Sequence, residues 1–280
     1  MNLQELRTFL AIIETGSLVR ASEALNVTQS TVTARLKSLE DELGQTLLIR
    51  NKSGATLTAA GMKLHRYADT ISNLWQQARQ ETALPDGTLA VCNIACELDL
   101  WPALGERFMD TLTDLYPNIG VSAWLGSQAD VTKWIAEGKS DLAFTYRSAF
   151  SQRQGQMALA PDELVLVSTV KNSPIKFDPS YIYVDAGEAF GRDHAIAYAD
   201  ADIARISFGN ATVGLDHLMR KGGSAYLPRR LVYDALAQER LFELTDAPIF
   251  KRAVFVTYDK NAREGWDWFD EVLEKAVLIG

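Results

Sequence analysis

The sequence predicts an α+β protein of more than one domain. Helical patterns and one hairpin pattern fill its first part, and from Thr88 onward strand and helix patterns alternate. A chain of 280 residues is long enough for about two domains, each with its own core. The hydrophobic fraction of 47% and the charged fraction of 23% are typical of globular proteins.

The formal net charge of −8 is unevenly distributed along the chain. Residues 1–84 contain 9 basic and 8 acidic side chains, whereas the remainder contains 19 basic and 28 acidic ones. Attraction to phosphate requires a local basic surface rather than a basic protein, so only the first part is a candidate for nucleic-acid binding. We expect a cytoplasmic protein without contact to a membrane, because the sequence has neither a signal peptide nor a long apolar run.

The stretch from Thr28 to Leu43 predicts an amphipathic helix. Its apolar residues recur at spacings of four, three and four, and they are Val32, Leu36, Leu39 and Leu43. Thr28 can cap the amino end, and Gly44 suits the left-handed residue that ends a helix. The opposite face carries side chains suited to base edges and phosphates, namely Gln29, Ser30, Thr33, Arg35 and Lys37.

Two further helices are predicted before this stretch, over Asn2–Glu14 and Ser17–Leu25. A two-residue connection separates the second of them from Thr28. Two short helices joined by a tight turn form a helix-turn-helix, whose second helix enters the major groove of DNA. The pattern alone is equally compatible with a small helical bundle.

A hairpin is predicted next, with strands over Leu47–Ile49 and Ala55–Leu57. Its turn carries Arg50 and Lys52, as a wing beside a DNA backbone would. A solvated turn is the commoner role of exposed cations.

Residues 1–80 resemble the amino-terminal domain of LysR-type transcriptional regulators. The positions that match the family pattern are Thr28, Gln29, Ser30, Thr33, Leu39, Glu40, Leu43, Gly44, Leu47, Arg50, Leu57, Thr58 and Gly61. The sequence departs from the pattern at Thr31 and Leu48, where Ala and Phe are usual. The resemblance implies a winged helix-turn-helix that binds double-stranded DNA. The predicted DNA contacts are Thr28, Gln29, Ser30, Thr31, Thr33, Arg35, Lys37, Arg50, Lys52 and Thr58.

A long helix is predicted over Thr58–Thr82, with a hinge at residues 83–87. Its apolar residues form a heptad-like seam made of Leu64, Tyr67, Ile71, Leu74, Trp75 and Ala78. Such a seam favours a coiled coil between two copies over packing on the helix's own domain. The resemblance also implies a linker helix that joins a homodimer, or the dimers within a tetramer.

The second part is predicted to contain a parallel sheet covered by helices. The predicted strands are Thr88–Ala95, Ile119–Leu125, Asp141–Tyr146, Glu163–Val170, Tyr181–Asp185 and Lys251–Tyr258. The predicted helices are Leu98–Tyr116, Val131–Glu137, Ala211–Arg220, Arg229–Ala237 and Ala262–Val277. The resemblance implies two α/β subdomains similar to periplasmic binding proteins, with an effector in the cleft. The expected boundaries are 1–61 for the DNA-binding domain, 58–87 for the linker helix and hinge, and 88–280 for the effector domain, divided into 88–162 with 248–280 and 163–247.

Ligands of open α/β sheets bind beyond the carboxyl ends of the strands. The predicted effector contacts there are Ala95, Cys96, Gly126, Ser127, Thr145, Tyr146, Arg147, Asp185, Phe190 and Tyr226. A helix amino end near Ser127, together with Arg147, could bind a small organic anion. Ordinary packing is the alternative for each of these residues.

Enzymatic motifs are missing from the sequence. The three histidines are scattered, and Cys92 and Cys96 are expected to be inert thiols rather than a redox switch. We therefore expect no catalysis, no cofactor and no metal. The sequence predicts a sequence-specific transcriptional regulator whose effector domain binds a small molecule that alters DNA binding. The alternative is a ligand-independent repressor or architectural factor.

Overall fold

A computed structural model describes residues 2–51, 54–82, 84, 87–148, 153–176, 178–200 and 204–277. The chain forms two compact units, Met1–Asp86 with Ala136–Lys139, and Gly87–Ile135 with Ser140–Gly280. Among the described residues, no helix is long and apolar enough to cross a membrane.

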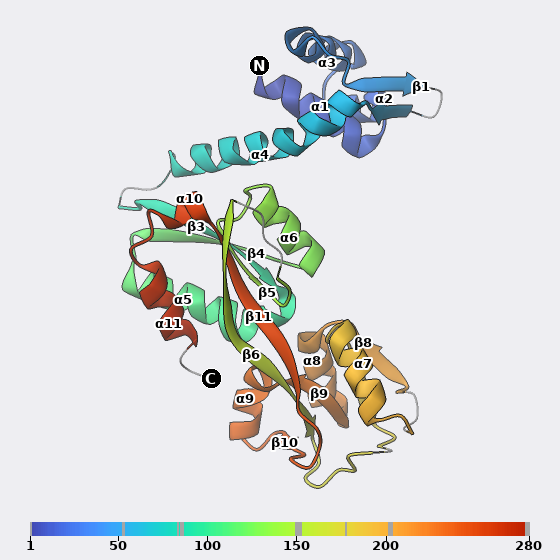
Figure 1. Ribbon diagram of the computed structural model, residues 1–280, viewed down its shortest axis with the longest axis vertical. Helices are drawn as coiled ribbons and strands as arrows, with labels where there is room; N and C mark the ends of the chain where they lie inside the picture. The colour runs from blue at the N-terminus through green and yellow to red at the C-terminus, as the bar shows by residue number, and fades with distance from the viewer. Residues whose placement is uncertain are drawn as a thin grey trace. The chain divides into compact units, whose positions relative to one another are not determined.

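The first unit contains four helices and one hairpin in the part of the chain that the structure describes (Figure 1). These elements are α1 (Leu3–Thr15), α2 (Leu18–Ala24), α3 (Gln29–Leu43), β1 (Leu48–Asn51), β2 (Gly54–Leu57) and α4 (Ala59–Glu81). The predicted helix and hairpin elements are confirmed, with ends shifted by one or two residues. The core consists of fully buried side chains from α1, α2 and α3 and the start of the hairpin, among them Leu6, Phe9, Ile12, Ala21, Val32, Leu36, Leu39 and Leu47.

Local signals set the two ends of α3. The Thr28 hydroxyl accepts a hydrogen bond from the Thr31 amide at 3.2 Å, and Gly44 ends the helix at φ 63°. Both ends are as predicted. Leu43 differs from the prediction, because it remains 45% exposed at the last turn, beyond the reach of the core.

The hairpin is attached to α3 by the side chain of Glu40. Its Oε1 accepts hydrogen bonds from the amides of Leu47 at 2.7 Å and Leu48 at 3.3 Å. On the other side, the Ala55 amide donates to the Gly16 carbonyl at 2.9 Å. These hydrogen bonds therefore fix the wing to the helix-turn-helix at two points.

The motif Leu-Thr-x-x-Gly joins the hairpin to α4. Thr58 donates its hydroxyl to the carbonyls of Thr46 at 2.7 Å and Leu47 at 3.2 Å, and it accepts from the Gly61 amide at 2.9 Å. A Cβ at Gly61 would lie 2.1 Å from the Leu47 carbonyl oxygen, so only glycine fits this position.

The second unit is built on one mixed sheet of nine strands among the described residues. The strands are β3 (Ala90–Glu97), β4 (Ile119–Gly126), β5 (Leu142–Thr145), β6 (Gln154–Ser168), β7 (Tyr181–Val184), β8 (Ile206–Phe208), β9 (Ser224–Pro228), β10 (Phe242–Glu243) and β11 (Phe250–Asp259). Their order is β4-β3-β5-β11-β6-β9-β7-β8, and β10 pairs with β6.

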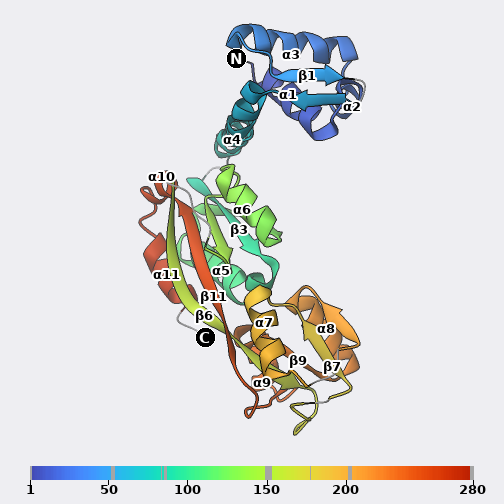
Figure 2. The same ribbon diagram turned by 45° about the vertical axis from the view of Figure 1, so that its right-hand side comes forward.

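The prediction of a parallel sheet is correct only within each half of this sheet. We call β3, β4 and β5 with their helices the first half, and β7, β8 and β9 with theirs the second half. Strands are parallel within each half, whereas β6 and β11 pair antiparallel with each other and with their neighbours. These two long strands run from one half to the other (Figures 1 and 2), because the chain enters the second half along β6 and returns along β11.

Helices cover both faces of the sheet in each half (Figure 2). They are η1 (Leu98–Leu100), the π-helix η2 (Trp101–Gly105), α5 (Glu106–Leu115), α6 (Gln128–Ala136), α7 (Glu188–Ala197), α8 (Ala211–Lys221), α9 (Arg229–Ala237), α10 (Lys260–Arg263) and α11 (Phe269–Val277). In the first half α5 and α11 pack on one face and α6 on the other. In the second half α8 and α9 pack on one face of the sheet and α7 packs on the other.

Several predicted elements were wrong in extent. The single helix expected over Leu98–Tyr116 is divided into η1, η2 and α5, and Pro102 stands at the start of η2. The helix expected over Ala262–Val277 is interrupted between α10 and α11, around Gly265. The helix α7 and the buried strand β9 were not predicted, because glycines at 187, 191, 222 and 223 resemble turn signals.

Candidate DNA interface and effector site

The first turn of α3 presents short polar side chains to solvent. Gln29 and Ser30 are exposed, and the Thr28 oxygen lies 2.8 Å from the hydroxyls of both Ser30 and Thr31. This turn contains no acidic residue. Free amides at a helix amino end attract anions, and hydroxyl and amide groups can pair with base edges. The turn therefore has the chemistry of a base-reading surface.

The other predicted DNA contacts divide into three groups. Lys37 is exposed and Thr33 half-buried on the same side of α3. Arg35 donates from Nη2 to Gln4 Oε1 of α1 at 2.5 Å, so the guanidinium is tied to the start of the chain. Arg50 lies in β1, and Lys52 lies outside the described residues.

Thr58 has a different role from the predicted DNA contact. Its hydroxyl caps α4 and bonds to two hairpin carbonyls. Because its hydrogen is committed to those carbonyls, the side chain holds the hairpin rather than a phosphate.

The predicted seam of α4 is divided between two faces. Leu64 and Ile71 pack against the core of their own unit, beside the fully buried Ala68. Tyr67, Leu74 and Trp75 are 62%, 47% and 47% exposed, and Ala78 is exposed as well. The prediction of one uniform seam is therefore corrected. The exposed part contains Tyr67, Leu74 and Ala78 at spacings of seven and four.

Four predicted effector contacts are core residues instead. Ala95 and Cys96 are fully buried on opposite faces of β3. Phe190 and Tyr226 are 4% and 2% exposed within an aromatic cluster around His194. The Tyr226 hydroxyl donates to the Pro248 carbonyl at 2.9 Å. All four side chains are buried against the faces of the sheet.

The predicted anion site at the start of α6 is filled by the chain itself. The amide and hydroxyl of Ser127 donate to Asp130 Oδ2 at 3.0 and 2.6 Å. Gly126 is buried against Trp134. Arg147 and Asp185 are exposed, and Thr145 donates its hydroxyl to the Arg147 carbonyl at 2.9 Å.

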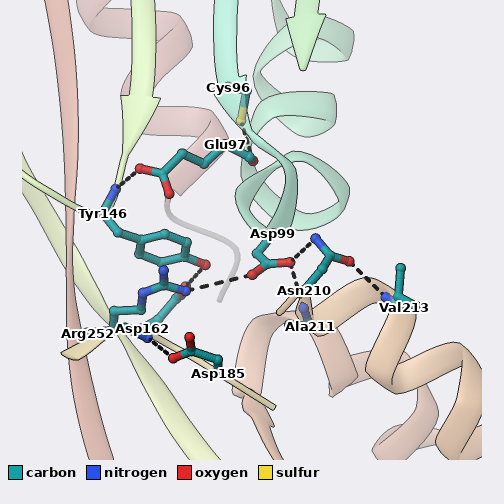
Figure 3. Close-up of polar contacts among 11 residues, drawn as sticks. Cys96, Glu97, Asp99, Tyr146, Asp162, Asp185, Asn210, Ala211, Val213 and Arg252 are labelled. Atoms are coloured by element: carbon teal, nitrogen blue, oxygen red, sulfur yellow. Dashed lines mark hydrogen bonds and ion pairs between the residues drawn. The ribbon is translucent and has the colours of Figure 1, made fainter. Parts of the chain in front are cut away.

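A network of buried charges connects the ends of β3 and β5 to the two long strands (Figure 3). Glu97 accepts a hydrogen bond from the Tyr146 amide at 2.8 Å, and the Tyr146 hydroxyl donates to Asp162 at 2.8 Å. The guanidinium carbon of Arg252 lies 3.3 Å from the centre of the Tyr146 ring. Arg230 of α9 forms an ion pair with Asp162.

Asp99 extends this network to the second half of the sheet. Its Oδ1 accepts from Asn210 Nδ2 at 2.6 Å and from the Ala211 amide at 2.8 Å (Figure 3). Its Oδ2 lies 3.8 Å from Arg252 Nη1. Asn210 also caps α8 by accepting from the Val213 amide at 2.9 Å. The amino end of α8 is therefore bound to a carboxylate of the first half.

Burial raises the pKa of the three carboxyl groups in the network. The rise in the pKa of Glu97 is opposed by the hydrogen bond from the Tyr146 amide. The rise in the pKa of Asp99 is opposed by the hydrogen bond from the Ala211 amide. The positive charge of Arg252 opposes the rise in both groups. For Asp162 the rise is opposed chiefly by Arg230. Ionising each group therefore costs free energy, and its partners offset this cost in part.

Sequence reasoning predicted only Tyr146 of this network as a contact. Glu97 lies just beyond the predicted strand Thr88–Ala95, and that position was the available signal, whereas Asp99 fell within the helix predicted over Leu98–Tyr116. Asp162 and Arg252 lie on strands distant in sequence, so pattern alone cannot bring them together.

The two cysteines lie on one strand, four residues apart, with both thiols buried. Four strand residues span about 13 Å, which exceeds the reach of a disulfide. Burial raises the pKa of both thiols, so neither is a reactive thiolate.

Comparison with known proteins identifies the first unit. Residues 3–62 match the family described as bacterial regulatory helix-turn-helix proteins of the LysR family. The HTH-type transcriptional regulator HdfR of Escherichia coli K12 is 26% identical over 269 residues, covering 94% of this chain and 95% of HdfR. The first unit of this chain is a helix-turn-helix domain of the LysR family. HdfR, which this chain matches over nearly its whole length, is a transcriptional regulator.

Solved structures share the fold of this chain. ArgP from Mycobacterium tuberculosis is 22% identical with a TM-score of 0.62, covering 97% of this chain and 96% of its own. LysG from Corynebacterium glutamicum with bound effector Arg is 20% identical with a TM-score of 0.58, covering 99% of each chain. The arrangement of helix-turn-helix and mixed sheet is thus common to these proteins.

The raised pKa of Glu97 predicts a pH dependence of stability. Between 4.5 and the folded pKa, the folded protein binds more protons than the unfolded chain, so the free energy of unfolding falls as pH rises. Glu97→Gln removes this dependence of the free energy of unfolding on pH, because the glutamine side chain does not titrate. The variant should therefore gain stability relative to the native chain as pH rises from 4.5 toward the folded pKa, measured by urea unfolding.

Glu271→Gln is the matched control for this pH experiment. Glu271 is exposed, and its pKa is lowered first by the hydrogen bond from Lys275. Its stabilising contribution is fully present above its ordinary pKa of 4.5, so the control should be less stable than the native chain by a nearly constant amount over the same range. Equal pH trends in the two variants would contradict the assignment of a buried carboxylate.

Proposed function

We propose that this chain is a LysR-type transcriptional regulator that reads operator DNA with the first turn of α3 in the major groove. The observation that carries the proposal is the exposed, acid-free turn at Gln29 and Ser30, opposite the buried apolar stripe. A recognition helix points its amino-terminal residues at base edges, and those residues here are hydroxyls and an amide.

The proposed roles follow from position on α3 and the hairpin. Residues of the first turns, Thr28, Gln29, Ser30, Thr31 and Thr33, contact bases or the adjacent backbone. Lys37, Arg50 and Lys52 contact phosphates. Arg35, tied to Gln4, holds the start of α1 beside α3 and reaches phosphate with its remaining donors.

The proposed domain boundaries are those expected from the sequence, 1–61, 58–87 and 88–280, with subdomains of 88–162 with 248–280 and of 163–247. The exposed seam of α4 joins two copies in a homodimer, which can assemble further into a tetramer. A dimer supplies two recognition helices for two half-sites. The protein works in the cytoplasm, where it meets DNA.

We also propose that a small organic anion, bound between the two halves of the sheet, alters DNA binding. The half-buried cation Arg252 and the amino end of α8 support this class of effector. LysG provides a relative with a bound effector, arginine. The second candidate is a ligand-independent regulator. It is favoured by the observation that carboxylates of the chain already bind the starts of α6 and α8.

Selection from a random DNA pool tests the proposed function. The native protein should enrich a site with two half-sites about 10 base pairs apart, and its affinity should fall steeply with salt. Recovery of unenriched DNA would refute sequence-specific binding. A thermal-shift screen of small carboxylates then separates the two candidates: stabilisation by one of them supports an effector, and none supports ligand independence.

The exposed seam predicts the effect of a charge at position 74. Leu74→Lys should produce a smaller assembly in sedimentation velocity, because the cation would be buried between the helices. Leu115→Lys, at an exposed position of α5, serves as the control and should sediment like the native chain. Ile71→Lys is unsuitable because Ile71 also packs on its own unit. An unchanged assembly for Leu74→Lys would refute the seam.

A further inference from the structure

The amino end of α8 binds a carboxylate that comes from the other half of the sheet. Asp99 comes from η1, at the carboxyl end of β3 in the first half, yet its carboxylate binds α8 of the second half. Its Oδ1 accepts hydrogen bonds from the Asn210 side-chain amide at 2.6 Å and from the Ala211 backbone amide at 2.8 Å. Asp99 is 9% exposed, so water competes little for these donors.

A second set of contacts holds the other carboxylate oxygen. Arg252 on the crossing strand β11 lies 3.8 Å from Oδ2, and its guanidinium is stacked on the Tyr146 ring. The Tyr146 hydroxyl donates to Asp162, which pairs with Arg230 of α9. Asp99 therefore interacts with a helix end of the second half and with a cation that is stacked on Tyr146 of the first half.

We propose that Asp99 is an internal latch, an acidic side chain that holds the two halves of the sheet together in the effector-free regulator. The contact is an intramolecular version of anion binding at a helix amino end. Its regulatory consequence rests on the proposed function: an anionic effector competes with Asp99 for the Asn210 and Ala211 donors and for Arg252.

Competition follows from the chemistry of the site. The two amide donors converge on one oxygen, and a second carboxylate in the same place would meet a like charge at close range. An entering anion must therefore displace Asp99. Once displaced, Asp99 no longer joins η1 to α8, whereas β6 and β11 still run through both halves. The latch thus links effector entry to the arrangement of the halves.

The test combines hydrogen exchange with chemical rescue in the full-length protein. In Asp99→Ala, the Ala211 amide loses its acceptor, and exchange at the start of α8 should accelerate on the order of tenfold or more, as expected for loss of a charged hydrogen bond. Added sodium formate supplies a free carboxylate and should slow this exchange again and raise the Tm. Sodium chloride at equal ionic strength should not.

Two variants serve as comparison. Asp99→Asn keeps an oxygen acceptor without the charge, so exchange should be intermediate and formate should have little effect; it also covers the case in which Asp99→Ala does not fold. Asp216→Ala removes an exposed ion pair with Arg220 farther along α8 and should match the native chain in both measurements. Native exchange at Ala211 in both Asp99 variants, or equal formate responses in Asp99→Ala and Asp216→Ala, would overturn the latch.

Operator binding of the same variants separates the latch from the proposed function. An operator affinity in Asp99→Ala that differs at least about fivefold from that of the native chain and Asp216→Ala supports regulation by the latch, since couplings of that size are usual. Faster exchange with unchanged operator affinity refutes the regulatory part alone. Failure of the native chain to select any DNA refutes the proposed function and leaves the exchange result standing.

Discussion

Burial of the apolar stripe of α3 is the constraint on which the DNA-binding unit depends. Val32, Leu36 and Leu39 are at most 1% exposed, and burial of such side chains stabilises by about 1.5–3 kcal/mol each. Consecutive helix residues lie about 100° apart, so a shift by one residue would remove the stripe from the core. The stripe therefore fixes which residues face outward, and Glu40 then places the wing relative to that face.

The second unit depends in the same way on the antiparallel pairing of β6 with β11. Because both strands run through both halves, the halves share one sheet, and their arrangement depends on contacts where the strands cross between them. Arg252 and Asp162 lie at that crossing, next to Asp99 and Tyr146 (Figure 3). Charges concentrated at the crossing make it a place where a bound anion can alter the arrangement of the halves.

Helix α3 could be predicted because its signals are local in sequence. The faces of α4 and the site in the second unit could not, because they depend on contacts between residues distant in sequence. The cap at Thr28, the helix end at Gly44 and the apolar stripe each depend on residues close together in sequence. The structure agrees with all three predictions except that Leu43 of the stripe is exposed. Periodicity cannot say which partner an apolar face meets, so Ile71 and Leu74 were placed in one seam although they face different surroundings. The site in the second unit was largely missed, because Asp99, Asn210 and Arg252 meet only through the sheet topology.

The central claim is that the first turn of α3 reads bases while the cations beside it bind phosphate. Comparing the site preferences of Gln29→Ala and Lys37→Ala, by selection from one DNA pool, tests this most directly. Gln29→Ala should lose about 1–3 kcal/mol of discrimination at one base step of each half-site. Lys37→Ala should bind all sequences more weakly and lower the salt slope by about 1. Unchanged preference in Gln29→Ala, with altered preference in Lys37→Ala, would contradict the assignment of the reading surface.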